Sequence, residues 1–521
     1  MLPRNIIVCA DGTGNKGGSS PDSNVYRVYK MVDKYYKGAC EDKVDIDEQI
    51  LFYDNGIGTQ KNSFIRAVTA GIGVGFKHNV CDLYKFLARN YVEGDRIYFF
   101  GFSRGASTVR ACNGMISKCG LAKSEGLRNC ELDKRVEEAY VAYKKHKTKP
   151  ELAKNFKNNK DICWGAVPIK FLGVWDTVVA LGFPKRTGIT GPVTLVLDIL
   201  FTFFEKIFDC ISPHSFYHYK LTDNVEYACQ ALAIDDERTA FWPYVWQEKN
   251  IEGAKDRTPE NVQQVWFPGM HANVGGGYER DGLAGVPLHW LMKQAQKHGL
   301  MFNTNAMLEA HETSHVHGRM YNSRLGLKMI YRYHPREIDK HCKDKLLGNI
   351  KIHESVIDRM YHRTANYVPG HIPASFDVVD SEIPANVIHH NPGSSSFWDA
   401  PRKLIDKLVN YRKRLYGAML AAFFTVLGFT IYYWNNPVPG ISREGNWGTF
   451  AEILDYFSLD MFDGLIDVVI VQEPRIFQAA IIFAVIYYFV RRYLLNQSVE
   501  AGESLRHVIL AEKPSDSEET L

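Results

Sequence analysis

The chain has 521 residues, of which 45% are hydrophobic and 13% aromatic, enough for a sizeable core and more than one structural unit. Its formal net charge is only +3, which argues against a nucleic-acid partner. Its ten cysteines show neither C-x-x-C pairs nor a metal-like spacing with histidine. We therefore expect reduced, buried thiols such as Cys9, Cys81 and Cys112, and neither a metal nor a cofactor.

The first predicted strand is "NIIVCA" (residues 5–10), and the glycine-rich loop Asp11-Gly12-Thr13-Gly14-Asn15 follows it. Lys16 comes next, but the spacing G-x-x-x-x-G-K-[ST] is missing, which disfavours a phosphate-binding loop. The run "AGIGVGF" (70–76) is a similarly weak nucleotide signal, because it leads into a predicted helix without a convincing strand before it.

The stretch "YFFGFSRGAS" (98–107) holds Gly101, Ser103 and Gly105 in the pattern G-x-S-x-G. The apolar run "RIYFFG" (96–101) predicts a buried strand before the serine, and apolar residues at helical spacing predict a helix after it. This context is typical of a nucleophile elbow, although the pattern alone also occurs by chance.

A serine nucleophile needs a base, and the base needs an orienting acid. Asp176 ends the predicted strand in "PIKFLGVWDTV" (168–178), and His271 follows the one in "VQQVWFPGMHANVGGGY" (262–278), before a glycine-rich loop. Ser103, Asp176 and His271 thus follow the order of the hydrolase fold, each after a strand.

The oxyanion of an acyl-transfer reaction needs backbone N–H donors. We expect one from Arg104, which follows the nucleophile, and another from Gly12 or Thr13 in the early glycine-rich loop. Asp235 and Asp236 are alternative acids, but we interpret their stretch, "AIDDERTAF", as a structural turn in which Arg238 pairs locally.

Six stretches resemble, in the same order, the α/β-hydrolase family typified by type VI secretion phospholipase effectors, which has uncharacterised bacterial and fungal members. They are "VCADGTGN", "LFYDNGIGT", "FFGFSRGAS", "FLGVWDTV", "QALAIDDERTAFWP" and "VWFPGMHANVGGGY". The resemblance covers roughly residues 4–300. It implies an α/β fold with a mostly parallel sheet flanked by helices, and an esterase or phospholipase that uses Ser103, Asp176 and His271. The family usually has an acid two residues after the histidine, where this chain has Asn273.

The apolar stretch "PVTLVLDILFTFFEKIFDCI" (192–211) falls where hydrolases of this fold often insert a cap. We expect a cap or lid over residues 185–220, with an ordinary buried helix as the alternative. Residues 133–161 predict solvated helices. Residues 300–395 give weaker signals, and we assign them to the rest of a catalytic domain that spans 1–400.

The segment "LYGAMLAAFFTVLGFTIYYW" (415–434) has twenty uncharged residues, about the length that crosses a membrane as a helix. The segment "IFQAAIIFAVIYYFV" (476–490) spans only if the arginines after it snorkel. Basic residues flank the pair, and seven acids lie between them against two arginines. The positive-inside rule then predicts a transmembrane hairpin over 401–495, with an external acidic loop at 435–475 and a polar tail at 496–521. Two buried helices of a soluble domain are the alternative.

Together these features predict a membrane-anchored serine esterase or phospholipase that acts on membrane phospholipid. Its catalytic domain would face the cytoplasm from the bacterial inner membrane, or from another cytoplasm-facing membrane, with two passes. Such an enzyme endangers its own membrane, so we expect a regulatory protein or trigger, as for a toxin or defence effector. Two alternatives stay open. The same residues would serve a soluble-ester hydrolase or an acyltransferase, and the hairpin would disrupt membranes if the hydrolase-like domain were only a sensor. The sequence does not indicate the oligomeric state.

Overall fold

The computed structural model describes residues 3–12, 14–34, 48–56, 71–178, 217, 219–249, 257–324, 333–380, 396–436, 449, 451–452 and 474–511. Thr13, nearly all of the predicted cap and most of the predicted acidic loop lie outside these residues. The chain divides into two compact units, and the second holds Ala400–Leu505.

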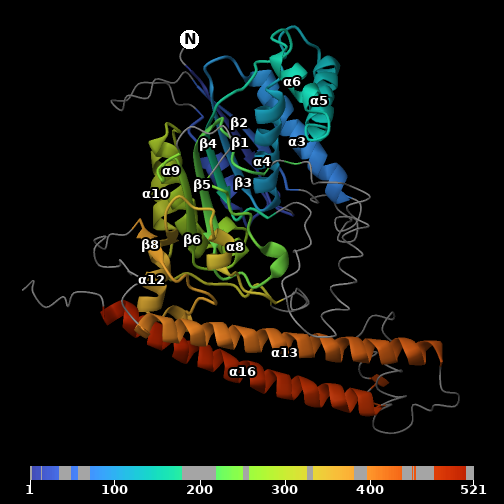
Figure 1. The fold of residues 1–521 in the computed structure, drawn as a ribbon, viewed down its shortest axis with the longest axis vertical. Coiled ribbons are helices and arrows are strands. Elements are labelled where there is room, and N and C mark those ends of the chain that lie inside the picture. Colours follow the sequence, from blue (N-terminus) through green and yellow to red (C-terminus); the bar gives the residue numbers. More distant parts are fainter. Residues whose placement is uncertain are drawn as a thin grey trace, which may run out of the picture. The chain divides into compact units, whose positions relative to one another are not determined.

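Within the described residues, the first unit is built on one eight-stranded sheet whose neighbouring strands are all parallel. The strand order is β2-β1-β3-β4-β5-β6-β7-β8 (Figure 1). The strands are β1 (Asn5–Ala10), β2 (Gln49–Asp54), β3 (Arg96–Phe102), β4 (Ile169–Trp175), β5 (Val225–Ala233), β6 (Val262–Phe267), β7 (Ile350–His353) and β8 (Phe376–Val379). The predicted α/β fold with a mostly parallel, helix-flanked sheet is confirmed.

The central strands are apolar throughout because helices cover both faces of the sheet. Ile6 and Val8 of β1 belong to the core under α3 (Gly71–Asn90), α4 (Arg104–Cys119), α5 (Asn129–Lys144) and α6 (Pro150–Asn158). Ile7 and Cys9 point to the opposite core, under α1 (Asn24–Met31), α9 (Gly282–Lys297) and α10 (Thr304–Glu312). Figure 1 shows these two helical layers on either side of the sheet.

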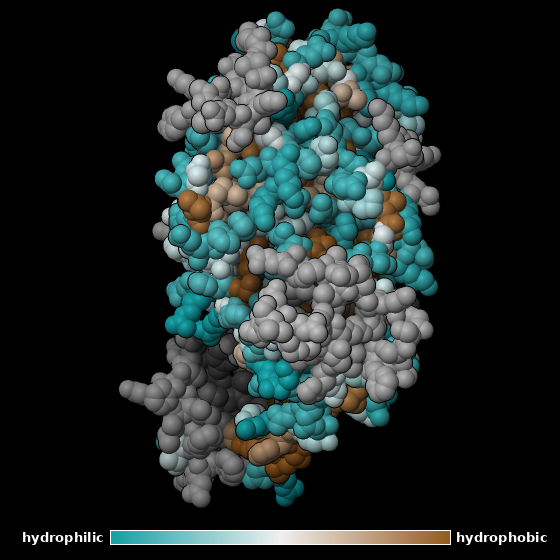
Figure 2. All heavy atoms as spheres, turned by 90° about the vertical axis from the view of Figure 1, so that its left-hand side faces the viewer, coloured by the Kyte–Doolittle hydropathy of each residue, from teal (hydrophilic) through white to brown (hydrophobic). Residues whose placement is uncertain are grey.

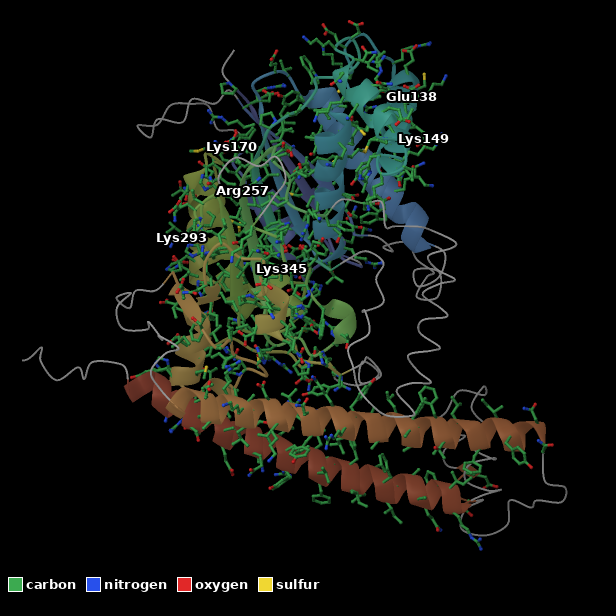
Figure 3. All side chains as sticks on the ribbon, viewed as in Figure 1. Glu138, Lys149, Lys170, Arg257, Lys293 and Lys345 are labelled. Atoms are coloured by element: carbon green, nitrogen blue, oxygen red, sulfur yellow. The ribbon has the colours of Figure 1, made fainter. Side chains whose placement is uncertain are left out.

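Helices α5 and α6 correspond to the solvated helices predicted over 133–161. They are amphipathic rather than wholly solvated, since Val136, Tyr140 and Phe156 are buried in the core. Two of the lysines labelled in Figure 3 pair with carboxylates from other segments of the chain. The Nζ atom of Lys170 lies 2.6 Å from the Oε2 atom of Glu226, and the Nζ atom of Lys293 lies 3.7 Å from the Oδ1 atom of Asp380. The face seen in Figure 2 is mostly hydrophilic, with hydrophobic side chains in small groups.

The order of the strands reverses at β1, which pairs with β2 on one side and β3 on the other. The segment after β1 leads to α1 on one face of the sheet, whereas β3 leads directly to α4 on the other. In open parallel sheets a crevice forms at such a switch point, outside the carboxyl ends of the strands. The loop after β1 and the turn after β3 meet there.

The second unit contains most of two long helices, α13 (Ser396–Asn435) and α16 (Pro474–Ala511). The first predicted span lies within α13 and the second within α16. Among the described residues, one helical stretch, Arg475–Arg506, is long and apolar enough to cross a membrane by length and composition alone. Helix α16 also continues to Ala511, so the polar tail predicted from residue 496 begins as helix.

Candidate active site

Ser103 occupies a one-residue turn between β3 and α4, at φ 57° and ψ −119°. This backbone conformation is strained for a residue with a side chain, and strain of this kind gathers at functional sites. The flanking glycines make the turn possible. A Cβ on Gly101 would lie 2.7 Å from the Cα of Ala106, and one on Gly105 would lie 2.1 Å from the carbonyl oxygen of Ala10. The glycines of the G-x-S-x-G pattern are therefore needed for close packing of strand, turn and helix.

His271 is the first residue of the short helix α8 (His271–Gly275), which follows β6. The glycine-rich loop predicted after this histidine begins only at Gly276, because residues 271–275 are helical. The imidazole contacts two aromatic rings, with its centroid 4.6 Å from that of Phe102 and 5.0 Å from that of Phe241. Gly275 leaves room for the Phe102 ring, since a Cβ there would come within 1.9 Å of it.

The three predicted site residues form one chain of hydrogen bonds at the carboxyl ends of β3, β4 and β6. The Nε2 atom of His271 lies 2.8 Å from the Oγ atom of Ser103, and its Nδ1 atom lies 2.5 Å from the Oδ2 atom of Asp176. Asp176 is fully buried, whereas Ser103 retains 8% of its exposure. A serine bonded to an imidazole that a carboxylate orients is the arrangement that nucleophilic catalysis requires.

Arg336 completes the surroundings of the buried carboxylate. Its Nη1 and Nη2 atoms donate to the two oxygens of Asp176 at 2.6 and 2.7 Å, and the N–H of Ala233 donates to Oδ1 at 3.0 Å. Burial alone would raise the pKa of Asp176, but the guanidinium of Arg336 and the imidazole of His271 together hold that pKa below its usual range. Asp176 therefore stays ionised and accepts only. Sequence reasoning missed Arg336, which lies in the weakly patterned region 300–395.

Asp235 and Asp236 hold the backbone beside His271. Asp236 forms the predicted local pair with Arg238, at 2.6 Å, and accepts the backbone N–H of His271 at 3.2 Å. Asp235 accepts the N–H of Gly269 at 2.6 Å, and burial raises its pKa to about 7. Neither side chain bonds the imidazole; both fix the turn that presents it.

The predicted oxyanion loop lies beside Ser103, because a Cβ on Gly12 would be 3.3 Å from the Cβ of Ser103. The N–H of Gly12, however, donates to the Oδ1 atom of Asp11 at 2.6 Å, so this predicted donor is already engaged. Thr13 lies outside the described residues. Arg104 is the first residue of α4, the end of the helix at which the helix dipole favours an anion.

Asn273 stands where the resembling family usually has an acid. Its Nδ2 atom donates to the carbonyl oxygen of Arg319, and its Oδ1 atom accepts the N–H of Tyr321, each at 3.0 Å. A carboxylate accepts only and could not make both bonds. Asn273 therefore joins the turn of His271 to the loop around residue 320.

A parallel α/β sheet with a serine on a strained turn, bonded to a histidine after a later strand, is the arrangement of α/β-hydrolases. Residues 4–294, more than half of the chain, match the catalytic domain of Tle1-like phospholipase effectors of the type VI secretion system. The chain belongs to this family, as its motifs predicted.

An uncharacterized protein of Saccharomyces cerevisiae is 26% identical to this chain, over 58% of this chain and 58% of its own length. A crystal structure of an uncharacterized Pseudomonas aeruginosa protein has 14% identity and a TM-score of 0.36, over 80% of this chain and 59% of that one. The Tle1 effector bound to the VgrG spike has 18% identity and a TM-score of 0.27, over 54% of this chain and 52% of that one. The chain thus spans less than two thirds of the length of each of these proteins.

Proposed function

We propose that the chain is a serine esterase that hydrolyses the acyl esters of glycerophospholipids. Ser103 would be the nucleophile, His271 the general base and Asp176 the acid that orients it. The observation that carries the proposal is the unbroken hydrogen-bond chain from Asp176 through His271 to Ser103. Membership of a phospholipase effector family supports a lipid ester as the substrate.

In the proposed reaction, the Nε2 atom of His271 takes the proton of Ser103 while Oγ attacks the ester carbonyl. Asp176 accepts the Nδ1–H of the same ring, which keeps Nε2 free for this proton. The backbone N–H groups of Arg104 and Thr13 are the proposed donors to the oxyanion. His271 then protonates the leaving alcohol, and a water that it deprotonates releases the fatty acid from the acyl-serine. No step requires a cofactor.

A fluorophosphonate probe is expected to label Ser103 of the detergent-solubilised protein, because the reagent reports an activated serine. Peptide mass spectrometry should find the adduct on Ser103, and labelling should vanish in Ser103→Ala. When each protein is incubated with phospholipid, lipid mass spectrometry should find free fatty acid and lysophospholipid with the native chain but not with Ser103→Ala. A folded protein that takes no label would overturn the serine mechanism.

We further propose that residues 401–495 form a membrane hairpin that holds a catalytic domain of residues 1–400, with a cap at 185–220, beside phospholipid. The stretch Arg475–Arg506 supports an anchor, since its most apolar part is almost entirely exposed. Large hydrophobic side chains on both long helices are exposed, among them Phe423, Ile431, Ile482 and Phe489. Such surfaces are stable in lipid and unfavourable in water.

Full-length protein is therefore expected to stay with membranes during alkaline carbonate extraction, because insertion of transmembrane helices is effectively irreversible. Immunoblots of pellet and supernatant measure this. A chain that lacks residues 402–521 should move to the supernatant and still cleave a short-chain soluble ester. Release of the full-length protein would mean that the two helices are not membrane spans.

The membrane-disruption alternative makes a different prediction for living cells. If the hairpin itself causes damage, toxicity on expression should survive Ser103→Ala. If ester hydrolysis causes it, the same substitution should abolish toxicity while leaving the protein in the membrane.

A further inference from the structure

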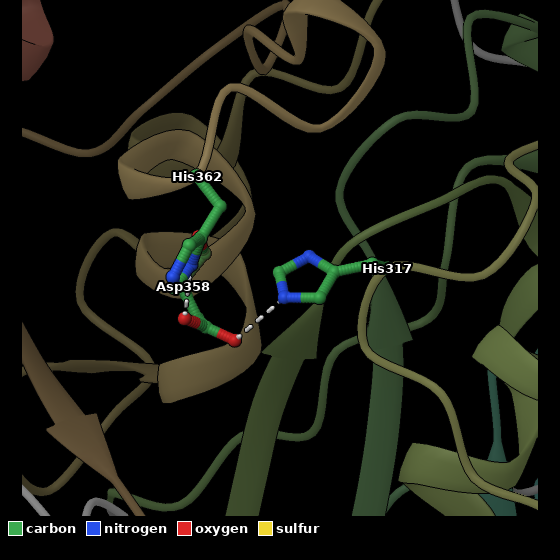
Figure 4. Close-up of side chains that lie close together, drawn as sticks. All are labelled: His317, Asp358 and His362. Carbon is green, nitrogen blue, oxygen red and sulfur yellow. Dashed lines mark hydrogen bonds and ion pairs between the residues drawn. The ribbon is translucent and has the colours of Figure 1, made fainter.

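Three side chains that bind metals well lie together on the first unit, apart from the candidate active site. They are His317, Asp358 and His362, whose potential ligand atoms all lie within 4.8 Å of one another (Figure 4). The Nε2 atom of His317 is 3.6 Å from the Oδ2 atom of Asp358. The Nδ1 atom of His362 is 2.9 Å from Oδ1 of the same carboxylate. One carboxylate thus faces two imidazoles.

The three residues come from two separate segments. Asp358 lies in α12 (Glu354–Tyr361), and His362 follows at its carboxyl end, one helical turn further on. Asp358 and His362 are four residues apart at a helix end, a spacing at which ion pairs often form, and this accounts for their contact. That spacing does not explain His317, which comes from the loop after α10 and points at the same carboxylate (Figure 4).

The ring of His317 is already oriented as a metal ligand would be. Its Nδ1 atom lies 2.6 Å from the Oγ1 atom of Thr364, which leaves Nε2 facing Asp358. Histidine ligands almost always use their second ring nitrogen in a hydrogen bond of this kind, which fixes the tautomer and the ring plane.

The backbone on both sides of His317 is fixed to the same helix. Arg359 of α12 is 1% exposed, and its Nη1 atom donates to the carbonyl oxygens of Val316 and Gly318 at 2.5 and 2.9 Å. Asn273 fixes the loop again further on, through Arg319. The position of His317 relative to Asp358 therefore does not depend on the contact between their side chains.

We propose that His317, Asp358 and His362 bind one divalent transition-metal ion of the zinc type. Two imidazoles and one carboxylate suit Zn²⁺, whereas Mg²⁺ and Ca²⁺ prefer oxygen ligands throughout. The side chains of His317 and His362 are 48% and 53% exposed, so an ion reaches them from solvent. Three protein ligands leave the fourth tetrahedral position to water.

The ion would fasten the loop of residues 313–323 to α12 and add to the bonds of Arg359. Through Asn273 this loop also supports α8, which begins at His271. The ion would act as a structural clamp on the loop that Asn273 bonds, and it would take no part in the proposed ester hydrolysis. The existence of the site does not rest on the proposed function.

Isothermal titration of metal-free, full-length protein with ZnCl₂ tests the proposal. We expect His317→Gln and His362→Gln each to lose one bound Zn²⁺ per chain. Thr364→Val should weaken the same site by roughly 10–100-fold, the usual effect of losing the partner of a histidine ligand. His315→Gln is the matched control, because His315 is exposed on the same loop but lies outside the cluster, and it should bind as the native chain does.

Thermal unfolding gives a second measurement that does not involve activity. Zn²⁺ should raise the Tm of the native chain and of His315→Gln, because an ion that binds only the folded state stabilises it. The Tm of His317→Gln should not respond. If the native chain binds no Zn²⁺, or if His317→Gln binds as much and as tightly, the proposal is wrong.

Discussion

Replacing Ser103 by alanine is expected to lower kcat for ester hydrolysis by about 10⁶, and adding His271→Ala should lower it hardly further. The Oγ atom of Ser103 and the Nε2 atom of His271, 2.8 Å apart, would act on the same proton, so neither works without the other. Steady-state kinetics on a short-chain soluble ester, for both single variants and the double variant, measure this.

Ser107→Ala is the matched control for that experiment. Ser107 also lies on α4, but its Oγ atom donates to the carbonyl oxygen of Val178 at 2.6 Å and not to a histidine. We expect this variant to keep kcat. If Ser103→Ala keeps its activity, or if the two single effects multiply in the double variant, Ser103 and His271 do not form a catalytic pair.

The sequence predicts the turn that holds Ser103 well because the determinants of this turn are local. Gly101 and Gly105 each lie two residues from Ser103, and the close packing of the turn requires both glycines. The strand before Ser103 and the helix after it each have an apolar pattern of their own. The same reasoning predicts Asp176 and His271 as site residues, since each follows an apolar strand in the chain order of the hydrolase fold.

The surroundings of the site were beyond sequence reasoning because they join distant segments. Arg336 lies 160 residues from Asp176, in a stretch without clear periodicity, and only the fold brings them together. The same holds for Asn273 and the loop that it bonds, 46 and 48 residues further on. The local pair of Asp236 and Arg238, two residues apart, was predicted because its partners are close in sequence.

Substituting Asp176 by asparagine is expected to lower kcat by about 10⁴, as the loss of an orienting carboxylate does in serine proteases. The structure adds a second effect, on stability. Both oxygens of Asp176 accept only from N–H donors, so an amide NH₂ in either orientation meets a donor of Arg336. The fully buried guanidinium also loses its counter-ion, which costs about 3–5 kcal/mol of unfolding free energy. Denaturant unfolding and steady-state kinetics separate the two effects.

The dependence of the unfolding free energy on pH, measured at acidic pH, tests whether Asp176 is the buried, ionised carboxylate described above. The pKa of Asp176 is lower in the folded chain than in the unfolded one, so its contribution to stability is complete above about pH 4, the usual value of a free aspartate. That contribution is lost as the pH falls toward the folded-state pKa. The asparagine variant should lack this part of the pH dependence. If Asp235 or Asp236 were the orienting acid instead, Asp176→Asn would leave kcat nearly unchanged.

Adding Arg336→Met to Asp176→Asn should separate the role in stability from the role in catalysis. Removal of the guanidinium takes away the uncompensated buried charge, and replacing a whole buried ion pair by apolar or neutral groups is often nearly neutral. The double variant should therefore regain much of the lost unfolding free energy while kcat stays low. The amide oxygen of the asparagine accepts the N–H of Ala233, so its NH₂ faces Nδ1 of His271 and favours the wrong tautomer, and no carboxylate stabilises the imidazolium. Arg336→Met alone should be unstable, since it leaves Asp176 buried with one partner fewer. If activity returned together with stability, Asp176 would act only by neutralising Arg336, and the orienting acid would have to be sought elsewhere.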